Sequence, residues 1–187
     1  MMHKVGLQGG IEMDLKELPP GDDVPNEINV VIEIPAQSLP VKYELNKKAN
    51  VFMVNRFLAT AMYYPCNYGF IPHTLAEDHD PLDVMVITPH PLFSGAVIPS
   101  RPVGLLQMTD ESGPDTKILA VPADRLSALY RHVKKPSDLG EETLLQIAHF
   151  FQHYKELEVG KWSQVDDWEN ASAAKKEILA SIKRYQK

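Results

Sequence analysis

The chain has 187 residues, of which 44% are hydrophobic and 24% are charged, as in an ordinary globular protein. Its 25 Asp and Glu residues exceed its 19 Lys and Arg residues, and the net charge of −6 argues against general binding to nucleic acid. The single Cys66 excludes an intrachain disulfide and no apolar run could span a membrane, so we expect a cytoplasmic protein without a membrane partner.

The first residues are expected to form an arm that precedes the domain. Three of the ten glycines lie before Met13, and the stretch LPPGDDVP follows at residues 18–25. Glycine and proline at this density disfavour regular secondary structure. We therefore expect an irregular N-terminal arm at residues 1–21 and a single domain at residues 22–187, since neither a repeat nor a linker interrupts the latter.

Short β-rich runs recur from Ile28 onward. Turn-forming residues cluster between these runs, as they do at the ends of strands. Many short strands with little room for crossover helices predict a mainly β fold, in which an antiparallel sheet curls into a small barrel. The expected strands are residues 28–35, 41–45, 51–54, 83–88, 96–108 and 117–123.

The last third of the chain predicts helices, so the fold class as a whole is α+β. Residues 123–133 are expected to form a short helix. Residues 141–158 carry apolar side chains at helical spacing, which predicts an amphipathic helix of about five turns. Residues 160–168 are expected to form a loop or a short strand. Asn170 is a suitable N-cap for a final helix over residues 171–187.

Two acidic groups lie beside the predicted strands. EDHDPLD, at residues 77–83, places four carboxylates directly before an apolar run, and Pro81 stiffens their spacing. TDESGPDTK, at residues 109–117, follows the long run over residues 96–108. Strand ends of one barrel would bring both groups together, and oxygen-only ligands suit a hard cation such as Mg²⁺. A solvated acidic surface is the alternative for either group taken alone.

Other metal chemistries fit these residues less well. An EF-hand loop that starts at Asp78 would need glycine at its sixth position, where the chain has Asp83. His149 and His153 lie one helical turn apart, but HFFQH lacks the glutamate of a zinc metalloprotease helix. Packing or a subunit contact is the preferred interpretation of these histidines, and acidification is expected to weaken an assembly that they join.

Cationic and aromatic side chains precede the first acidic group. Lys42 and Glu44 alternate with apolar residues, so the two-residue period of a strand places both charges on one face. An outward polar face is the ordinary interpretation of that pattern. Residues 56–68 contain Arg56 and three tyrosines, whose hydroxyl groups need partners if the rings are buried.

Five stretches of the chain, in unbroken order, form a longer pattern. They are VIEIPAQSLPVKYE (31–44), VNRFLATAMYYPCNYGFIPHTL (54–75), DHDPLDV (78–84), RPVGLLQMTDESGPDTKILAVP (101–122) and IAHFFQHYKELEVGKWSQVDDW (147–168). Together they resemble the soluble family I inorganic pyrophosphatases, the bacterial type especially. The resemblance covers about residues 22–185, and residues 1–13 fall outside it.

The resemblance implies a fold, a reaction and cofactors. The fold would be a five-stranded OB-like β-barrel with flanking C-terminal helices, and the activity would be hydrolysis of inorganic pyrophosphate to two orthophosphates. Several Mg²⁺ ions are implied in each active site, with Mn²⁺ or Zn²⁺ as substitutes, and bacterial members are typically homohexamers. The metal ions would neutralise the substrate and activate the attacking water. Because the carboxylates repel one another without metal, metal binding should stabilise the fold.

The resemblance also implies roles for individual residues. The residues that match metal ligands are Asp78, Asp83, Asp110 and Asp115, with Glu33 holding a further metal ion through water. The implied catalytic residues are Asp80, which matches the carboxylate that activates water, and Tyr68, Lys42 and Arg56. The implied substrate-binding residues are Lys42, Glu44, Arg56, Tyr68, Lys117, Tyr154 and Lys155. The supporting positions in the pocket are Tyr64, Glu111 and Lys161.

One position departs from the family pattern. Between Asp78 and Asp80 the family usually carries Gly or Asn, which tolerate a left-handed backbone, whereas this chain has His79. We interpret His79 as a strained or reshaped turn rather than as a participant in the chemistry.

Two other functions are alternatives to pyrophosphate hydrolysis. A larger pyrophosphate-containing substrate, either a nucleotide or a polyphosphate, would use the same Mg²⁺-dependent hydrolysis, although the sequence shows no nucleoside pocket. The other alternative is an OB-type nucleic-acid-binding module. The acidic balance and the carboxylates argue against that module, because such proteins present aromatic and arginine side chains.

Overall fold

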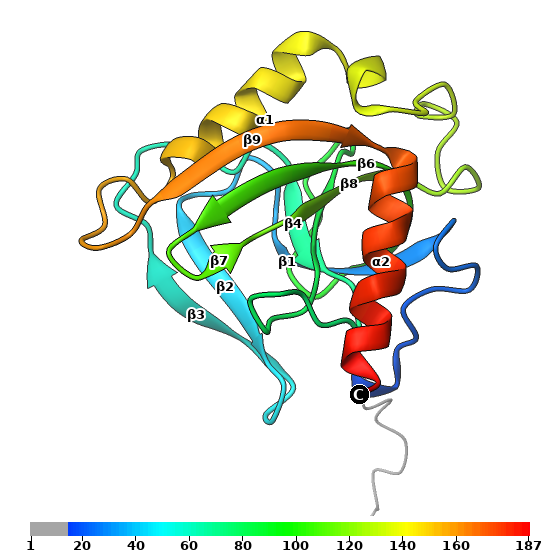
Figure 1. Cartoon of the computed structure of the whole chain (residues 1–187), viewed down its shortest axis with the longest axis horizontal. Helices are drawn as coiled ribbons and strands as arrows, with labels where there is room; N and C mark the ends of the chain where they lie inside the picture. Colours follow the sequence, from blue (N-terminus) through cyan, green and yellow to red (C-terminus); the bar gives the residue numbers. More distant parts are fainter. Residues whose placement is uncertain (1–14) are drawn as a thin grey trace, which may run out of the picture.

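The structure is a computed structural model that describes residues 15–187, so most of the expected N-terminal arm lies outside the described residues. In this part of the chain five strands form a closed ring (Figure 1). The ring runs β1–β4–β5–β8–β6 and closes because β1 pairs with both β4 and β6. This arrangement confirms the predicted mainly β fold with a five-stranded OB-like architecture. The elements in chain order are η1 (Leu15–Glu17), β1 (Ile28–Ile34), β2 (Val41–Asn46), β3 (Val51–Phe57), β4 (Asn67–Phe70), β5 (Asp83–Val86), β6 (Val97–Asp110), β7 (Gly113–Pro114), β8 (Lys117–Pro122), η2 (Pro136–Leu139), α1 (Glu141–His153), β9 (Ser163–Asn170) and α2 (Ala171–Tyr185).

The predicted antiparallel sheet is wrong at one pair of strands. β5 and β8 run parallel, whereas the other pairings of the described sheets are antiparallel. The 14-residue strand β6 lies between β5 and β8 in the sequence and pairs antiparallel with β8. Since β6 reverses the direction of the chain, β5 and β8 point the same way.

Side chains on the two faces of the ring pack into two cores. Alternation along β5 places Val84 and Val86 in one core and Met85 in the other, and β8 divides Ile118 from Leu119 in the same way. Helix α1 packs on the core that contains Met85 and Leu119, which we call the α1-side core. Helix α2 packs on the other, the α2-side core. Burial on both faces explains why these strands are continuous apolar runs in the sequence.

Strand β4 is missing from the predicted strands, because NYGF shows no alternation of apolar and polar residues. Its position depends on Gly69. A Cβ atom at this residue would lie 1.9 Å from the carbonyl oxygen of Val31 on β1. Only glycine therefore allows β4 to approach β1 this closely.

The predicted helices are confirmed at two places and wrong at a third. α1 ends at His153, earlier than the predicted end at residue 158, and the chain turns there toward the carboxylates. The Asn170 cap is confirmed, since its side chain accepts hydrogen bonds from the N–H groups of Ser172 and Ala173 at 2.9 and 3.2 Å. The segment before Asn170 is the strand β9, which pairs with β6.

The short helix predicted for residues 123–133 is wrong, and the segment forms turns instead. The guanidinium of Arg101 on β6 donates to the carbonyl oxygens of Val133 and Tyr130 at 2.7 and 3.0 Å. It also pairs with Asp124 at 3.2 Å. The segment thus wraps around a side chain from a distant strand, and a local sequence pattern does not reveal that interaction.

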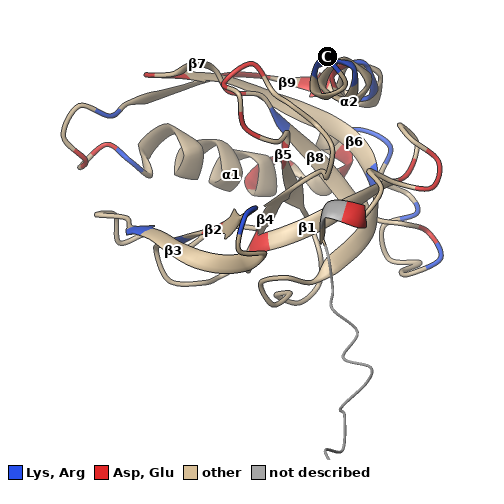
Figure 2. Cartoon of the chain, turned by 90° about the horizontal axis from the view of Figure 1, so that it is seen from below, with Lys and Arg blue, Asp and Glu red and all other residues tan. Residues whose placement is uncertain are grey.

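Strands β2 and β3 form a separate hairpin beside the ring, with Lys42 opposite Arg56. Figure 2 shows α1 between this hairpin and the strands β7 and β9. Among residues 15–187, no helix is both long and apolar enough to cross a membrane.

Candidate active site

The charged side chains meet at one end of the α1-side core. Asp83 and Lys117 are the first residues of β5 and β8, two positions before Met85 and Leu119, so the strand period places them on the face of that core. A cavity of about 260 Å³ opens at this end. The predicted site residues all line it: Glu33, Lys42, Glu44, Arg56, Tyr68, Asp78, Asp80, Asp83, Asp110, Asp115, Lys117, Tyr154 and Lys155.

The charges around the cavity are numerous and mixed. Within the described part of the chain, eight acidic and six basic side chains line it, so its formal charge is negative. The acids come from β1, the hairpin, the loop before β5, the first residue of β5 and the region from the end of β6 to the start of β8, segments far apart in the sequence. The ring of strands therefore brings together the two acidic groups that the sequence places at strand ends.

Lys117 forms a buried cluster with two of these acids. It is 1% exposed, and its Nζ lies 2.9 Å from Oδ2 of Asp83 and 2.8 Å from Oδ1 of Asp115. It also donates to the hydroxyl of Tyr68 at 3.0 Å. Burial alone would lower the pKa of Lys117, but the charges of Asp115 and Asp83 outweigh it and hold the pKa well above the ordinary value.

Tyr68 links this cluster to the aromatic wall of the cavity. Burial raises the pKa of its phenol far above the ordinary value, so the hydroxyl stays protonated and donates to Asp83. Its ring lies 5.8 Å from that of Phe151 on α1, and Phe151 lies 5.7 Å from Tyr154. Nζ of Lys117 lies 5.3 Å from the centroid of Tyr68 and 5.4 Å from that of Phe151, a cation–π arrangement.

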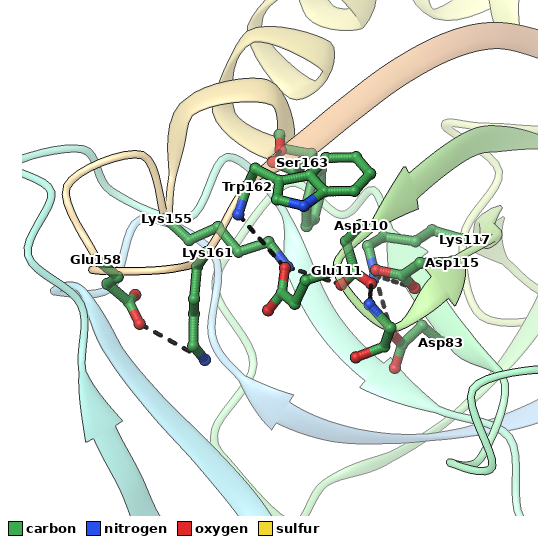
Figure 3. A network of polar contacts seen from close by, with 12 residues as sticks. Asp83, Asp110, Glu111, Asp115, Lys117, Lys155, Glu158, Lys161, Trp162 and Ser163 are labelled. Carbon is green, nitrogen blue, oxygen red and sulfur yellow. Dashed lines mark hydrogen bonds and ion pairs between the residues drawn. The ribbon is translucent and has the colours of Figure 1, made fainter.

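A second lysine holds the acids at the β6–β7 turn. Nζ of Lys155 contacts Asp110 at 2.7 Å and Glu111 at 2.9 Å, and Figure 3 shows both lysines pointing toward the same group of carboxylates. Asp110 also accepts a hydrogen bond from the N–H of Ser112 at 2.7 Å. Although burial opposes the shift, the hydrogen bond from Lys155 lowers the pKa of Asp110.

The loop before β5 presents Asp78 and Asp80. The N–H of Asp80 donates to Oδ1 of Asp78 at 3.1 Å, and its carbonyl oxygen accepts from the N–H of Ala76 at 2.7 Å. Burial raises the pKa of Asp78 above its ordinary value. His79 has a φ of 72°, which confirms the left-handed turn predicted between the two acids.

The hairpin supplies cations from the opposite side. Nζ of Lys42 contacts Glu44 at 2.6 Å, which confirms that both charges lie on one face of β2. Nε of Arg56 lies 3.0 Å from Glu158, and Lys161 lies 3.7 Å from the same oxygen (Figure 3 draws the second pair). These contacts connect the hairpin with the turn that follows α1.

Glu33 on β1 is the most deeply buried acid at the cavity after Asp115, at 9% exposure. Its Oε1 accepts a hydrogen bond from the N–H of Leu45 at 2.9 Å. Burial raises its pKa to about 8, with the hydrogen bond from Leu45 opposing the shift. A carboxyl group with this pKa is ready to ionise when a cation approaches it.

The lysines separate the carboxylates from one another. Over residues 15–187, no three His, Cys, Asp and Glu side chains surround a common point suited to one metal ion. The ammonium groups of Lys117 and Lys155 lie between the acids and balance their charge. Oxygen donors are thus abundant, and a metal ion would share the carboxylates with the two lysines.

Comparison with known proteins agrees with this chemistry. The sequence model of the family described as inorganic pyrophosphatase matches residues 30–186. The inorganic pyrophosphatase of Escherichia coli (strain K12) is 57% identical over 172 residues, which are 92% of this chain and 98% of that protein. This chain belongs to the inorganic pyrophosphatase family.

Solved structures of similar proteins confirm the predicted family and fold. A crystal structure of an inorganic phosphatase from Anaplasma phagocytophilum has a TM-score of 0.90 and 48% identity, and covers 91% of this chain and 100% of its own. The inorganic pyrophosphatase of Thermus thermophilus has a TM-score of 0.87 and 42% identity, and covers 93% of this chain and 99% of its own.

Sequence reasoning missed several residues that line the cavity of this family member. Lys47 lies in the turn NKKAN, where a charged residue is ordinarily solvated, yet the hairpin carries it over the cavity. Ser112 lies inside the second acidic group, and its N–H orients Asp110. Phe70 and Phe151 appear in the sequence as ordinary core residues. Lys47 can be identified only from the position of the hairpin relative to the ring. No local sequence signal marks Ser112, Phe70 or Phe151 as cavity residues.

Proposed function

We propose that this chain hydrolyses inorganic pyrophosphate to two orthophosphates, with Mg²⁺ as its cofactor. One observation carries the proposal: eight carboxylates and six cationic side chains converge on one small cavity in a member of the inorganic pyrophosphatase family. Its volume of about 260 Å³ lies below the roughly 300–1,000 Å³ of pockets that enclose drug-sized ligands. That size favours two linked phosphates over a nucleotide.

The charge of the cavity explains why metal ions are needed. The lining is formally negative, and a pyrophosphate anion would be repelled by it. The donors available to a metal ion are carboxylate oxygens, which suit a hard cation that also binds phosphate oxygens. The residues present therefore fit Mg²⁺ better than a soft metal ion.

We assign the metal-holding role to four aspartates of the two acidic groups and to the buried acid on β1. When bound, Mg²⁺ would neutralise the phosphate charge and lower the pKa of the attacking water. The proposed ligands are Asp78, Asp83, Asp110, Asp115 and Glu33.

The cationic side chains would hold the phosphate groups. Lys117 and Lys155, which now bond to carboxylates, would turn to phosphate oxygens as substrate enters and leave their carboxylates to the metal ions. Lys42 and Arg56 reach the cavity from the hairpin and would bind from the opposite side. Tyr154 offers a hydroxyl at the cavity wall. Fixed cations around the anhydride stabilise the charge that moves onto the leaving phosphate.

Asp80 is the proposed general base. It lies at the exposed edge of the cavity, where it would accept the proton of the attacking water. Tyr68 and Glu44 would act in support, since Tyr68 orients Asp83 and Glu44 orients Lys42.

The test is release of orthophosphate from pyrophosphate with and without Mg²⁺. Wild-type protein should need Mg²⁺, and Asp80→Asn should lower kcat by about 10²- to 10⁴-fold, the usual contribution of a general base. Asp167→Asn on the exposed face of β9 is the matched control and should keep full activity. Wild-type protein that leaves pyrophosphate intact in Mg²⁺ buffer, or that releases phosphate faster from ATP, would refute the proposed substrate.

We also propose that the chain acts in the cytoplasm as a homohexamer. Several large apolar side chains are exposed, among them Phe57 and Phe93, each at 76%. Exposed apolar surface of this kind often marks contacts between subunits. Sedimentation of the purified protein should give a species of six chains, and a monomer at micromolar concentration would contradict this assembly.

A further inference from the structure

The C-terminal helix holds the segment that leads into the loop of Asp78. Both backbone hydrogen-bonding groups of Leu75 bond to α2. The N–H of Leu75 donates to the carbonyl oxygen of Ser181 at 3.1 Å, and its carbonyl oxygen accepts from Nε of Arg184 at 2.7 Å. Leu75 precedes Asp78 by three residues, whereas neither Ser181 nor Arg184 is among the described residues that line the cavity.

The two groups on α2 are themselves held in place. Arg184 forms an ion pair with Glu177, which lies two turns earlier on the same helix. Ser181 is fully buried, and its hydroxyl donates to the carbonyl oxygen of Ile178 at 2.8 Å. Ile178 belongs to the α2-side core. Packing of α2 on the sheet therefore determines where both partners of Leu75 lie.

A short series of hydrogen bonds connects Leu75 with the acidic loop. Oγ1 of Thr74 donates to the carbonyl oxygen of Ile71 at 2.6 Å and accepts from the N–H of Leu82 at 2.9 Å. The N–H of Ala76 donates to the carbonyl oxygen of Asp80 at 2.7 Å. The residues on both sides of Leu75 thus close the base of the loop, and a shift of Leu75 would be passed to it.

The loop is closed by hydrogen bonds among its own residues, from the N–H groups of Ala76, His79 and Asp80, but little burial anchors it to the rest of the protein. His79 and Asp80 are exposed, so burial does not hold them, and the left-handed backbone of His79 is unfavourable for a residue other than glycine. Asp83 differs, because it belongs to β5 and its neighbours on β4 and β8 hold the strand.

We propose that Arg184 is a positioning residue that sets the spacing of Asp78 and Asp80 through the carbonyl group of Leu75, a role that rests on the function proposed for those two carboxylates. Removal of the guanidinium frees Leu75 to shift, and the loop acids lose their fixed spacing. The binding of Mg²⁺ then weakens, while the fold and the position of Asp83 persist.

The test is calorimetric titration of Mg²⁺ into substrate-free protein, with Arg184→Gln compared with Lys183→Gln. Lys183 is the exposed neighbour of Arg184, and its substitution removes the same charge. Loss of a positive charge by itself favours binding of a cation, so the charge effect has the opposite sign to the proposed one. We expect the Kd for Mg²⁺ to rise on the order of tenfold in Arg184→Gln, as when a supporting group of a metal ligand is lost, and not to rise in Lys183→Gln.

Two further variants protect the test against a folding defect. Arg184→Lys keeps a donor for Leu75 and should have an intermediate Kd. Glu177→Gln, which releases Arg184, should raise the Kd more than Asp167→Asn, which removes the same negative charge from the exposed face of β9. These two variants decide the question if circular dichroism shows that Arg184→Gln is unfolded. Equal Kd values for Arg184→Gln and Lys183→Gln, even with a lower urea midpoint in the former, would overturn the positioning role. Wild-type protein that binds no Mg²⁺ would overturn the proposed function, and this role with it.

Discussion

The buried ion pairs of the ring and the partly exposed pairs of the hairpin place the same chemical groups in different surroundings. Lys117 on β8 is 1% exposed and bonds to two carboxylates and a hydroxyl. Lys42 on β2 has a side chain that is 28% exposed, and its partner Glu44 is 41% exposed. Both lysines line one cavity, so a single site contains a rigid cation and an adjustable one.

The difference follows from solvation. Charges taken out of water need several partners in good geometry, and removal of one partner leaves the others unpaired. Charges in contact with water lose little when a partner leaves, because water replaces it. The ring cluster therefore defines the shape of the site without substrate, and Lys117 would turn to phosphate only when metal ions take over its carboxylates. The hairpin pair can exchange a carboxylate for a phosphate by itself.

Substitution of Lys117 should give the largest difference in stability between the ring cluster and the hairpin pair. Lys117→Met leaves Asp83 and Asp115 without their common cation, and we expect it to lower the free energy of unfolding by about 3–5 kcal/mol in metal-free buffer. Lys42→Met, the same change on the hairpin, should lower it by at most about 1 kcal/mol. Urea denaturation measures both, and equal losses would show that burial does not separate the two lysines.

Addition of Mg²⁺ should give the next largest effect. A ligand that binds only the folded protein stabilises it by about 2.7 kcal/mol at a concentration near 100 times its Kd. The Tm should therefore rise with Mg²⁺ and fall again with a chelator. The rise should be larger in Lys117→Met, because its carboxylates lack a counter-charge. A Tm that does not respond to Mg²⁺ would contradict the assignment of these acids as metal ligands.

Added salt should weaken the hairpin ion pair more than the ring ion pair, and double-mutant cycles at low and high salt measure both coupling energies. The Lys42–Glu44 pair should have a coupling energy of about 0.2–1 kcal/mol at low ionic strength, and it should largely vanish near 1 M salt, where the Debye length is about 3 Å. The Lys117–Asp115 pair should keep most of its coupling under the same conditions, because the two side chains are only 2% and 10% exposed. Similar salt dependence for both pairs would indicate that water enters the ring cluster.

The smallest effect is expected at a surface carboxylate that is not among the described residues lining the cavity. The N–H groups of Lys134 and Lys135 donate to Asp138 at 2.8 and 3.1 Å, and they lower its pKa from the ordinary value of 3.8. A lowered pKa in the folded state means that the contribution to stability is complete above pH 3.8 and is lost as the pH falls through the folded value. Asp138→Asn should therefore make stability slightly less dependent on pH below 3.8, with no change in the slope near pH 7. Acid titration of the unfolding midpoint measures this.

Local sequence patterns correctly predict the strands and helices that are determined by residues close together in the sequence. The runs over residues 83–88 and 117–123 become β5 and β8 because both of their faces are apolar. Asn170 begins α2 because its own side chain bonds to the following N–H groups. The acidic groups at residues 77–83 and 109–117 indicate a cation site because so many carboxylates in a short stretch need compensation.

Local patterns fail where a distant residue decides the structure. Residues 123–133 have helical spacing but wrap around Arg101 from β6. Strand β4 has no strand pattern, and its place depends on the space that Gly69 leaves for β1. The parallel pairing of β5 and β8 depends on the path of β6 between them.

The sequence by itself determined which chemistry this chain carries: oxygen ligands, cations and tyrosines, in an order that matches one family. The tertiary structure alone decided that Lys117 lies between Asp83, 34 residues away, and Asp115. It also decided that a helix outside the cavity holds the loop of Asp78. The physical reason is that residue types and spacings act within a few residues, whereas desolvation and charge pairing depend on which segments the folded chain brings into contact.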